Sequence, residues 1–342
     1  MKNVLVTGNL GYIGSVLTDV LCQANFNVIG YDVGYFNNFN LSKNKFNIKQ
    51  IIRDIRDIEI KHLNSIDYVI HLAAISNDPL GEFSPNITEE INFKSTIKLA
   101  RFAKEAGVKR FIYASSQSLY GISDSFLELD EDNSVKNPIT AYAKSKWLSE
   151  IELKKLNDEK FNIVIFRPST VFGASPRIRC DIVFNNFLAS AFTRKKITIK
   201  SNGKPFRPAI HIRDVCTAFI AGIKAPAELV ANEAFNIGFK NGNFSVLDLA
   251  NYAKKFVKNS YIDIKNETGE DERTYIVSFD KILNRLDKFY IPEWNLEKGA
   301  KEILSFFESS NFKKEYFDSW QTNRLKQIKR LQNLNKIDSD LR

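Results

Sequence analysis

A glycine turn near the start of the chain, Gly8-Asn9-Leu10-Gly11-Tyr12-Ile13-Gly14, constrains the fold most strongly. It follows a β-rich run, Val4–Thr7, and opens the helical pattern of Ile13–Ala24. Gly8 permits a tight turn, Gly11 lets the backbone approach a pyrophosphate, and Gly14 allows close packing of helix on strand. The helix N-terminus then presents unpaired N–H groups and the positive end of its dipole to phosphates. The turn therefore predicts a dinucleotide site.

Asp32 ends the second predicted strand, Val28–Asp32. A carboxylate there can accept hydrogen bonds from the adenosine ribose hydroxyls and would repel a 2′-phosphate, so NAD is favoured over NADP. The alternative is that Asp32 is only a turn residue. For Asp54 we expect either contact with the adenine edge or a role as a loop cap.

Short β-rich runs alternate with helical segments through the first half of the chain, which predicts an α/β fold with a parallel sheet covered by helices. Predicted strands are Val4–Thr7, Val28–Asp32, Tyr68–Leu72 and Arg110–Ser115, with further apolar runs at Asn162–Arg167 and Ala234–Ile237. Predicted helices are Ile13–Ala24, Ile87–Ala106 and Ala141–Leu156. After Gly173 the pattern loosens. We expect residues 1–173 to form the cofactor domain, with 206–240 returning to it and Arg207–Gly222 rejoining the main sheet. Residues 174–205 and 241–310 would form a smaller substrate lobe, and 311–342 a helical tail.

Composition excludes several classes of protein. The 342 residues are 44% hydrophobic and 26% charged, as in ordinary globular proteins. No apolar run approaches the roughly 20 residues that span a bilayer, and the N-terminus lacks the pattern of a signal peptide. Three cysteines form no CxxC motif or Cys/His cluster, so neither a disulfide framework nor a metal site is expected. The cytosol is the expected compartment.

The net charge of +9 raises the question of nucleic-acid binding. Lysines and arginines are spread along the chain, however, without a basic block interleaved with aromatics. The basic tail is patterned like an amphipathic helix with a solvated face. No nucleic-acid partner is therefore expected, and a basic surface would equally attract a diphosphate.

A second motif points to chemistry. Tyr142 and Lys146 are four residues apart, which on a helix places them on one face, one turn apart. An ammonium there, beside a cationic nicotinamide, favours the phenolate and can bring the tyrosine pKa towards neutrality. Ser116, at the end of the strand Arg110–Ser115, can hold the reacting oxygen. Ser115 is a competing assignment.

These motifs, in order, with the GxxGxxG spacing and His71-Leu72-Ala73-Ala74, closely resemble the extended short-chain dehydrogenase/reductase family. Within it the chain is similar to the NAD-dependent nucleotide-sugar epimerases, dehydratases and reductases. The resemblance implies a Rossmann-type doubly wound sheet with a smaller α/β C-terminal substrate lobe. It implies Ser116, Tyr142 and Lys146 as catalytic residues and a homodimer formed through the helices near 87–106 and 141–156. It also implies an NAD site made by Gly8, Leu10, Gly11, Tyr12, Ile13, Gly14, Asp32, Asp54, Ile55, Leu72, Ala73, Ala74, Tyr142 and Lys146.

For the substrate, the resemblance implies a nucleoside-diphosphate sugar. Ser76, Asn77 and Gln117 are expected near the sugar, and Thr170, Arg177, Arg179, Arg207 and Arg273 near its diphosphate. Guanidinium groups suit that role because their fork matches phosphate oxygens. Any one of these arginines could instead lie on the surface. His211 is expected to be structural, an acid–base role for Cys180 is a remote alternative, and Asn92 would either organise the site or act as a cap.

One departure from the family narrows the reaction. The 4,6-dehydratases carry an acid pair directly after the serine or threonine, whereas this chain has Gln117 and Ser118. Neither side chain can serve as that acid or base, so dehydration is disfavoured. The resemblance implies hydride transfer at C4 through a 4-keto sugar. With dehydration disfavoured, we expect the enzyme to be an epimerase. A one-way 4-dehydrogenase or 4-keto reductase is the alternative, and a non-catalytic dinucleotide-binding protein is the third.

Overall fold

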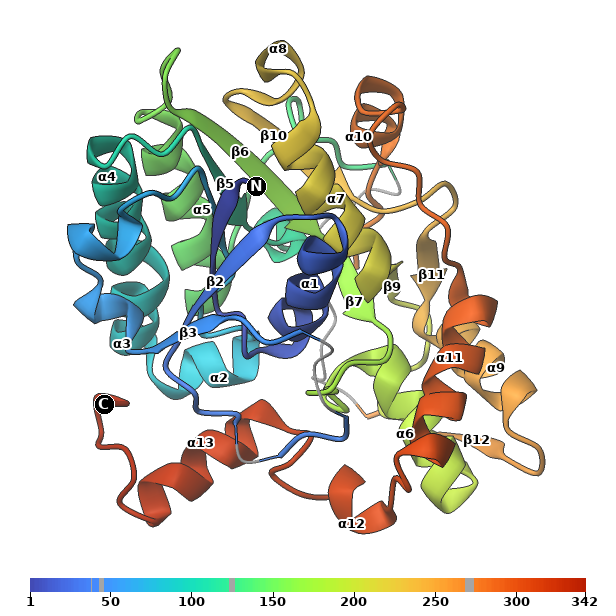
Figure 1. The fold of residues 1–342 in the computed structure, drawn as a ribbon. Coiled ribbons are helices and arrows are strands. Elements are labelled where there is room, and N and C mark those ends of the chain that lie inside the picture. The colour runs from blue at the N-terminus through green and yellow to red at the C-terminus, as the bar shows by residue number, and fades with distance from the viewer. Residues whose placement is uncertain (38, 43–45, 123–126, 268–273) are drawn as a thin grey trace.

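A seven-stranded, fully parallel sheet forms the centre of the molecule (Figure 1). The computed structural model describes residues 1–37, 39–42, 46–122, 127–267 and 274–342. The strand order is β10-β6-β5-β4-β1-β2-β3. The bounds are β1 (Asn3–Thr7), β2 (Asn27–Asp32), β3 (Lys49–Ile52), β4 (Tyr68–His71), β5 (Arg110–Ala114), β6 (Asn162–Pro168) and β10 (Glu233–Ile237). All six predicted apolar runs are strands of this sheet, and β3 is an additional edge strand.

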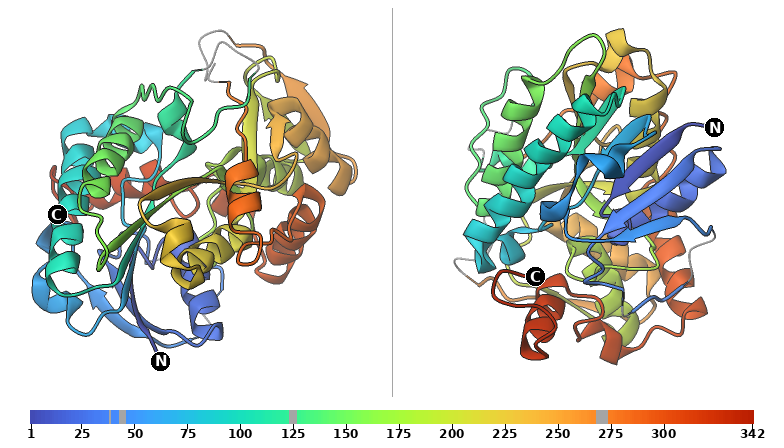
Figure 2. Two further views of the ribbon diagram at one scale, coloured as in Figure 1. Left: turned by 90° about the horizontal axis from the view of Figure 1, so that it is seen from above. Right: turned by 60° about the vertical axis from the view of Figure 1, so that its left-hand side comes forward.

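Helices cover both faces of the sheet, as a doubly wound fold requires (Figures 1 and 2). On one face α1 (Tyr12–Gln23) packs beside α7 (Ile212–Lys224). On the other lie α3 (Pro85–Glu89), the π-helical segment η3 (Glu90–Lys94), α4 (Ser95–Glu105) and α5 (Ala141–Lys154). The shorter elements are η1 (Ile55–Asp57), η2 (Ile60–Leu63), α2 (Asp78–Phe83), η4 (Gln117–Tyr120) and α8 (Ala227–Val230).

The strand order determines where a ligand crevice forms. After β1 the chain moves to β2 and β3 on one side, and after β3 it returns to β4 and β5 on the other. A crevice opens at such a switch point, outside the carboxyl ends of the strands. The glycine turn follows β1 directly, so it lies at this crevice.

The smaller lobe has two further sheets (Figure 1). One has the order β11 (Asn243–Ser245), β9 (Phe206–His211), β7 (Thr170–Phe172), and the other pairs β12 (Tyr261–Ile264) with β8 (Lys196–Ile199). Around them lie α6 (Val183–Arg194), α9 (Val246–Phe256) and α11 (Leu296–Ser309), whereas α10 (Asp280–Arg285) packs against β10 of the main sheet. We predicted that residues 207–222 rejoin the main sheet, and this was wrong for the strand in that segment, β9. β9 pairs with β7 and β11 instead, and only α7 packs against β5 and β6.

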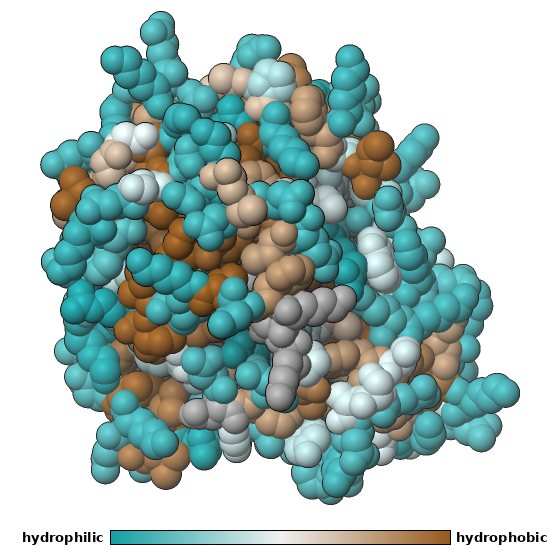
Figure 3. Space-filling model, viewed as in Figure 1, coloured by the Kyte–Doolittle hydropathy of each residue, from teal (hydrophilic) through white to brown (hydrophobic). Residues whose placement is uncertain are grey.

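The chain ends in a tail that carries α12 (Lys314–Phe317) and α13 (Arg324–Asn333). The tail leaves the smaller lobe and returns beneath β3 and α2, on the cofactor-domain side (Figures 1 and 2). Among the described residues, no helix is long and apolar enough to cross a membrane. The face of Figure 1 is mostly hydrophilic, with apolar side chains gathered over the region of β2 and β3 (Figure 3).

Candidate active site

A cavity of about 580 Å³ lies at the switch point, within the size range of small-molecule sites. It is bounded by the glycine turn, the ends of β2, β4 and β5, the first turns of α5, the junction of β6 and β7 at 168–171, and the tail helix α13. Most residues predicted from the sequence line it. These are Gly8, Gly11, Tyr12, Ile13, Gly14, Asp32, Asp54, Ile55, Leu72, Ala73, Ala74, Ser76, Asn77, Ser116, Gln117, Tyr142, Lys146, Thr170, Arg179 and Arg207.

The glycine turn has the geometry that a pyrophosphate requires. Gly8 has φ +73°, and a Cβ there would lie 2.7 Å from the Ala73 nitrogen. A Cβ on Gly14 would lie 2.2 Å from the Gly8 oxygen, so only glycine allows this approach of α1 to the turn. No side chain caps α1 at Gly11. Its first N–H groups therefore point at the cavity without a side-chain acceptor, which fits a bound dinucleotide.

Asp32 lies at the end of β2 and faces the same cavity. Its Oδ2 accepts from the Leu10 nitrogen at 3.0 Å and its Oδ1 from the Gly34 nitrogen at 2.7 Å. Burial raises the pKa of Asp32, while these two N–H groups and the nearby Arg177 act in the opposite direction. The carboxylate is thus fixed in orientation by the turn and retains lone pairs for ribose hydroxyls.

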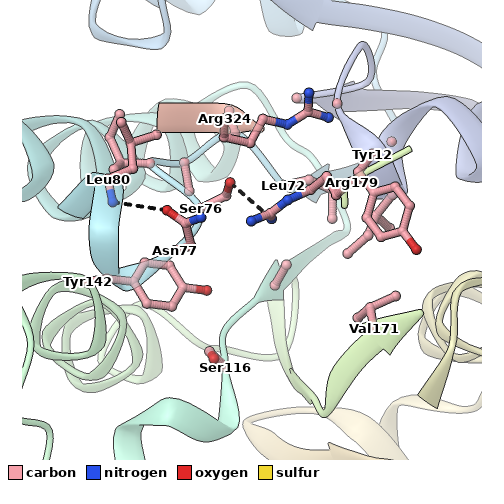
Figure 4. Close-up of a pocket in the computed structure, with 18 of the residues that line it drawn as sticks. Tyr12, Leu72, Ser76, Asn77, Leu80, Ser116, Tyr142, Val171, Arg179 and Arg324 are labelled. Carbon is pink, nitrogen blue, oxygen red and sulfur yellow. Dashed lines mark hydrogen bonds between the residues drawn. The ribbon is translucent and has the colours of Figure 1, made fainter. Parts of the chain in front are cut away.

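The serine, tyrosine and lysine meet as predicted. Thr140 caps the start of α5, accepting from the Ala143 nitrogen at 3.2 Å, and so fixes the first turn that carries Tyr142. Ser116 and Tyr142 both line the cavity. Figure 4 shows the tyrosine hydroxyl pointing into the cavity, with Ser116 on one side of it. Lys146 is buried, donates to the Ala114 oxygen at 2.7 Å, and lies 5.9 Å from the centre of the Tyr142 ring.

Burial dominates the protonation of this pair. It raises the pKa of Tyr142 to about 12, although the nearby Ser116 hydroxyl acts in the opposite direction. It lowers the pKa of Lys146 to about 7, and Glu150 opposes that shift. The protein by itself therefore holds Tyr142 as a phenol. The lysine does not bring the tyrosine towards neutrality without further positive charge in the cavity.

Ser115 is engaged elsewhere. Both serines line the cavity, but the Ser115 hydroxyl donates to the buried Glu150, whereas the Ser116 oxygen accepts from the Ser118 hydroxyl at 2.9 Å. Geometry thus favours Ser116 over the competing assignment. Asn92, in the π-helical segment, exchanges hydrogen bonds with the Ile75 backbone at 2.7 and 3.0 Å and donates to the Ser145 hydroxyl at 3.1 Å. It therefore links the loop after β4 to α5.

The cavity wall near Ser76, Asn77 and Gln117 is polar. Arg179 pairs with Asp181 at 2.9 Å and donates to the Ser76 hydroxyl at 3.4 Å, as Figure 4 shows for the latter. Asn77 donates to Asp181 at 3.2 Å. Gln117 donates to the Arg167 oxygen at 3.0 Å, and its buried Oε1 has no hydrogen-bond partner among the described residues.

Several predicted residues lie differently. Arg177 is not among the residues that line the cavity; it donates to the Phe36 oxygen at 3.1 Å and to Asn37 at 2.5 Å, which ties the loop after β2 in place. Leu10 contributes its N–H to Asp32 and does not line the cavity either. Asp54 borders the cavity but pairs with Arg56 at 2.7 Å. The predicted Arg273 lies outside the described residues.

Two further candidates are buried and are not among the residues that line the cavity. His211 stacks on Trp294 with ring centres 3.9 Å apart, and its Nε2 lies 2.8 Å from Glu302. Cys180 is buried, and burial raises the pKa of its thiol. Sequence reasoning missed Tyr35, Phe36, Asp181 and Arg324, which line the cavity. No motif marks them, because they reach it from loops and from the tail.

Fold and site together define a Rossmann-type dinucleotide enzyme with a serine, a tyrosine and a lysine at the switch point. The model of the NAD dependent epimerase/dehydratase family matches residues 4–238, and the chain belongs to this family. It is therefore an NAD-dependent enzyme of the nucleotide-sugar epimerase and dehydratase group.

Individual relatives span both activities. Human dTDP-D-glucose 4,6-dehydratase is 29% identical over 94% of this chain and 92% of its own length. A putative UDP-glucose 4-epimerase of Methanocaldococcus jannaschii is 28% identical over 90% of this chain and 99% of its own length. Among solved structures, UDP-glucuronic acid 4-epimerase from Bacillus cereus, in complex with UDP-glucuronic acid and NAD, has a TM-score of 0.77. That structure is 24% identical, covering 90% of this chain and 99% of its own, and shares the fold.

Proposed function

We propose that this enzyme is a nucleotide-sugar 4-epimerase that works through a transient 4-keto sugar. The observation that supports this best is that Ser116, Tyr142 and Lys146 line one cavity, with Tyr142 and Lys146 one turn apart on α5. Gln117 and Ser118 stand where a dehydratase needs an acid pair, and neither can transfer a proton at C5 or C6. The epimerases among its relatives point in the same direction.

Each residue of the site has its own role in the proposed reaction. Bound NAD supplies the acceptor, and later the donor, of the hydride at C4. Tyr142 takes the proton of the sugar 4-hydroxyl as that hydride leaves, and returns it when the keto-sugar is reduced on its other face. Ser116 donates a hydrogen bond to the same oxygen as it changes between hydroxyl and carbonyl. The positive charges of Lys146 and the nicotinamide counter the burial that otherwise keeps Tyr142 a phenol.

The sugar nucleotide would lie with its sugar against Ser76, Asn77 and Gln117. Its diphosphate would extend towards Arg179 and Arg207, which border the same cavity from the 174–205 segment and from β9. Arg179 is already paired with Asp181, so it would act as a fixed positive group. Thr170 adds a hydroxyl at the entrance to this side.

The deciding experiment incubates the purified enzyme with UDP-, GDP-, CDP- and dTDP-sugars and analyses the products by chromatography, mass spectrometry and NMR. Epimerisation forms a product of unchanged mass without added NAD. Tyr142→Phe, which keeps the ring and removes the hydroxyl, is the matched control and should abolish product formation.

Each alternative has a distinct outcome. Loss of two hydrogens with matching formation of NADH would establish a 4-dehydrogenase, and the reverse a 4-keto reductase. Loss of one water would establish a dehydratase and contradict our interpretation of Gln117. Turnover by Tyr142→Phe equal to wild type would contradict the proposed base.

We further propose a homodimer formed through α4 and α5, acting in the cytosol. Leu148 and Ile151 on α5 are 43% and 37% exposed in the single chain, and a second copy would cover them. Light scattering after size exclusion tests this, with Leu148→Glu expected to give monomers.

A further inference from the structure

The tail helix α13 forms part of the cavity wall. Asn323, Arg324, Leu325 and Ile328 line the cavity together with the glycine turn. Ile328 is fully buried in the apolar cluster that contains Leu80 and Ile55. In Figure 1 the helix lies beneath β3 and α2. The last segment of the chain thus covers the side of the crevice where β2 and β3 end.

Arg324 is a buried cation in this wall. It is 3% exposed, and its guanidinium lies 4.1 Å above the centre of the Phe36 ring. Among the described residues its side chain forms one hydrogen bond, from Nη2 to the Arg177 oxygen at 3.0 Å. A guanidinium carries five N–H donors, so several remain for a ligand.

The carboxylates around Arg324 do not fully balance the positive charge of the neighbouring guanidiniums. Burial lowers its pKa to about 9, and the neighbouring Arg179 and Arg177 act in the same direction. Asp181 and Asp32 act in the opposite direction, so three guanidiniums face two carboxylates. Buried charge of one sign is costly unless a partner neutralises it. An anion in the cavity would supply that partner.

The tail is fastened to the cofactor domain beyond α13. Gln327 donates to the Tyr35 oxygen at 2.8 Å. Arg56, held by Asp54, donates to the backbone oxygens of Asp340 and Leu341 at 2.8 and 3.1 Å. These contacts gather at the loop after β2 and the end of β3, beside Asp32. The tail therefore closes the adenosine side of the crevice and leaves the side near Tyr142 open to the sugar.

We infer that Arg324 is a cofactor-binding residue whose guanidinium donates to the diphosphate of NAD, with the tail as the wall that holds it there. The diphosphate is assigned to the dinucleotide because Arg324 lies beside Asp32 and Phe36, at the end of β2. This inference depends on NAD binding and not on the sugar reaction, so the two proposals can fail separately.

The test measures binding of NAD, ADP and adenosine to the full chain by calorimetry. Arg324→Gln should lower the binding affinity for NAD and for ADP about tenfold or more, because a charge-assisted hydrogen bond is lost. Adenosine, which lacks the diphosphate, should bind within about twofold of wild type. Lys336→Gln removes the same charge from an exposed position of the tail and should change none of the three.

Unchanged NAD affinity in folded Arg324→Gln would overturn the inference. So would an equal loss for ADP and adenosine, which would indicate packing of the wall alone. If the variant does not fold, amide hydrogen exchange of the wild-type protein provides the test instead. ADP should slow amide hydrogen exchange in α13 more than adenosine does, and equal exchange with both would reject a diphosphate contact.

Discussion

The buried ion pair between Glu150 and Arg167 offers the sharpest test of how the fold holds the site. Arg167 donates to Glu150 through Nε at 3.0 Å and Nη2 at 2.7 Å, and the two side chains are 2% and 0% exposed. Burial alone would lower the pKa of Arg167, but Glu150 outweighs it and raises that pKa. Glu150 is one turn beyond Lys146 on α5, so the pair fastens the helix that carries the proposed base to β6.

Glu150→Gln keeps the shape and leaves the guanidinium buried without its counter-charge. Breaking one side of such a pair costs about 3–5 kcal/mol, whereas replacing both members by apolar residues of similar size is close to neutral. We therefore expect a large loss of unfolding free energy in Glu150→Gln. The double variant with Glu150→Met and Arg167→Met should recover most of that loss.

Urea unfolding at pH 7 measures both values. The matched control is Glu152→Gln on the same helix, which breaks an exposed pair with Lys155 and should cost at most about 1 kcal/mol. A loss for Glu150→Gln no larger than that of the control would refute the reasoning. So would a double variant less stable than Glu150→Gln.

Three further predictions concern the site. Tyr142→Phe should lower kcat by about 10²–10⁴ and leave the Kd for NAD unchanged, as calorimetry can check; a parallel loss of NAD binding would contradict a role in proton transfer. Gly14→Ala should abolish NAD binding or folding, because its Cβ would lie 2.2 Å from the Gly8 oxygen; an intact Kd would contradict the close approach of α1 to the turn. Burial lowers the folded-state pKa of Lys146 to about 7, below the ordinary lysine value of 10.5. The unfolded chain therefore binds more protons between these values, and the destabilisation by Lys146, full below pH 7, declines as pH rises. The ligand-free Lys146→Met variant should thus melt above wild type at pH 6.5 by a larger margin than at pH 9, and a margin independent of pH would contradict the shift.

Features that depend on neighbours in the chain could be predicted from the sequence. The glycine turn, the tyrosine–lysine step and the apolar strands are set by spacing, since local geometry follows from residue type and period. The parallel sheet and the meeting of Ser116 with Tyr142 followed, because strand ends of an α/β sheet converge on one edge. The long helix expected at 87–106 also formed, although its middle turn is π-helical.

Only the tertiary structure decided which distant groups meet. Arg177 and Arg179 are two residues apart, yet one holds the loop after β2 and the other borders the cavity. Strand β9 (Phe206–His211) joined a different sheet from the one expected. Arg324 lines the cavity from the far end of the chain, and burial raises the pKa of Tyr142, which the tyrosine–lysine spacing does not reveal. Spacing in a sequence carries no information on desolvation or on contacts between remote segments, because both arise only when the folded chain excludes water.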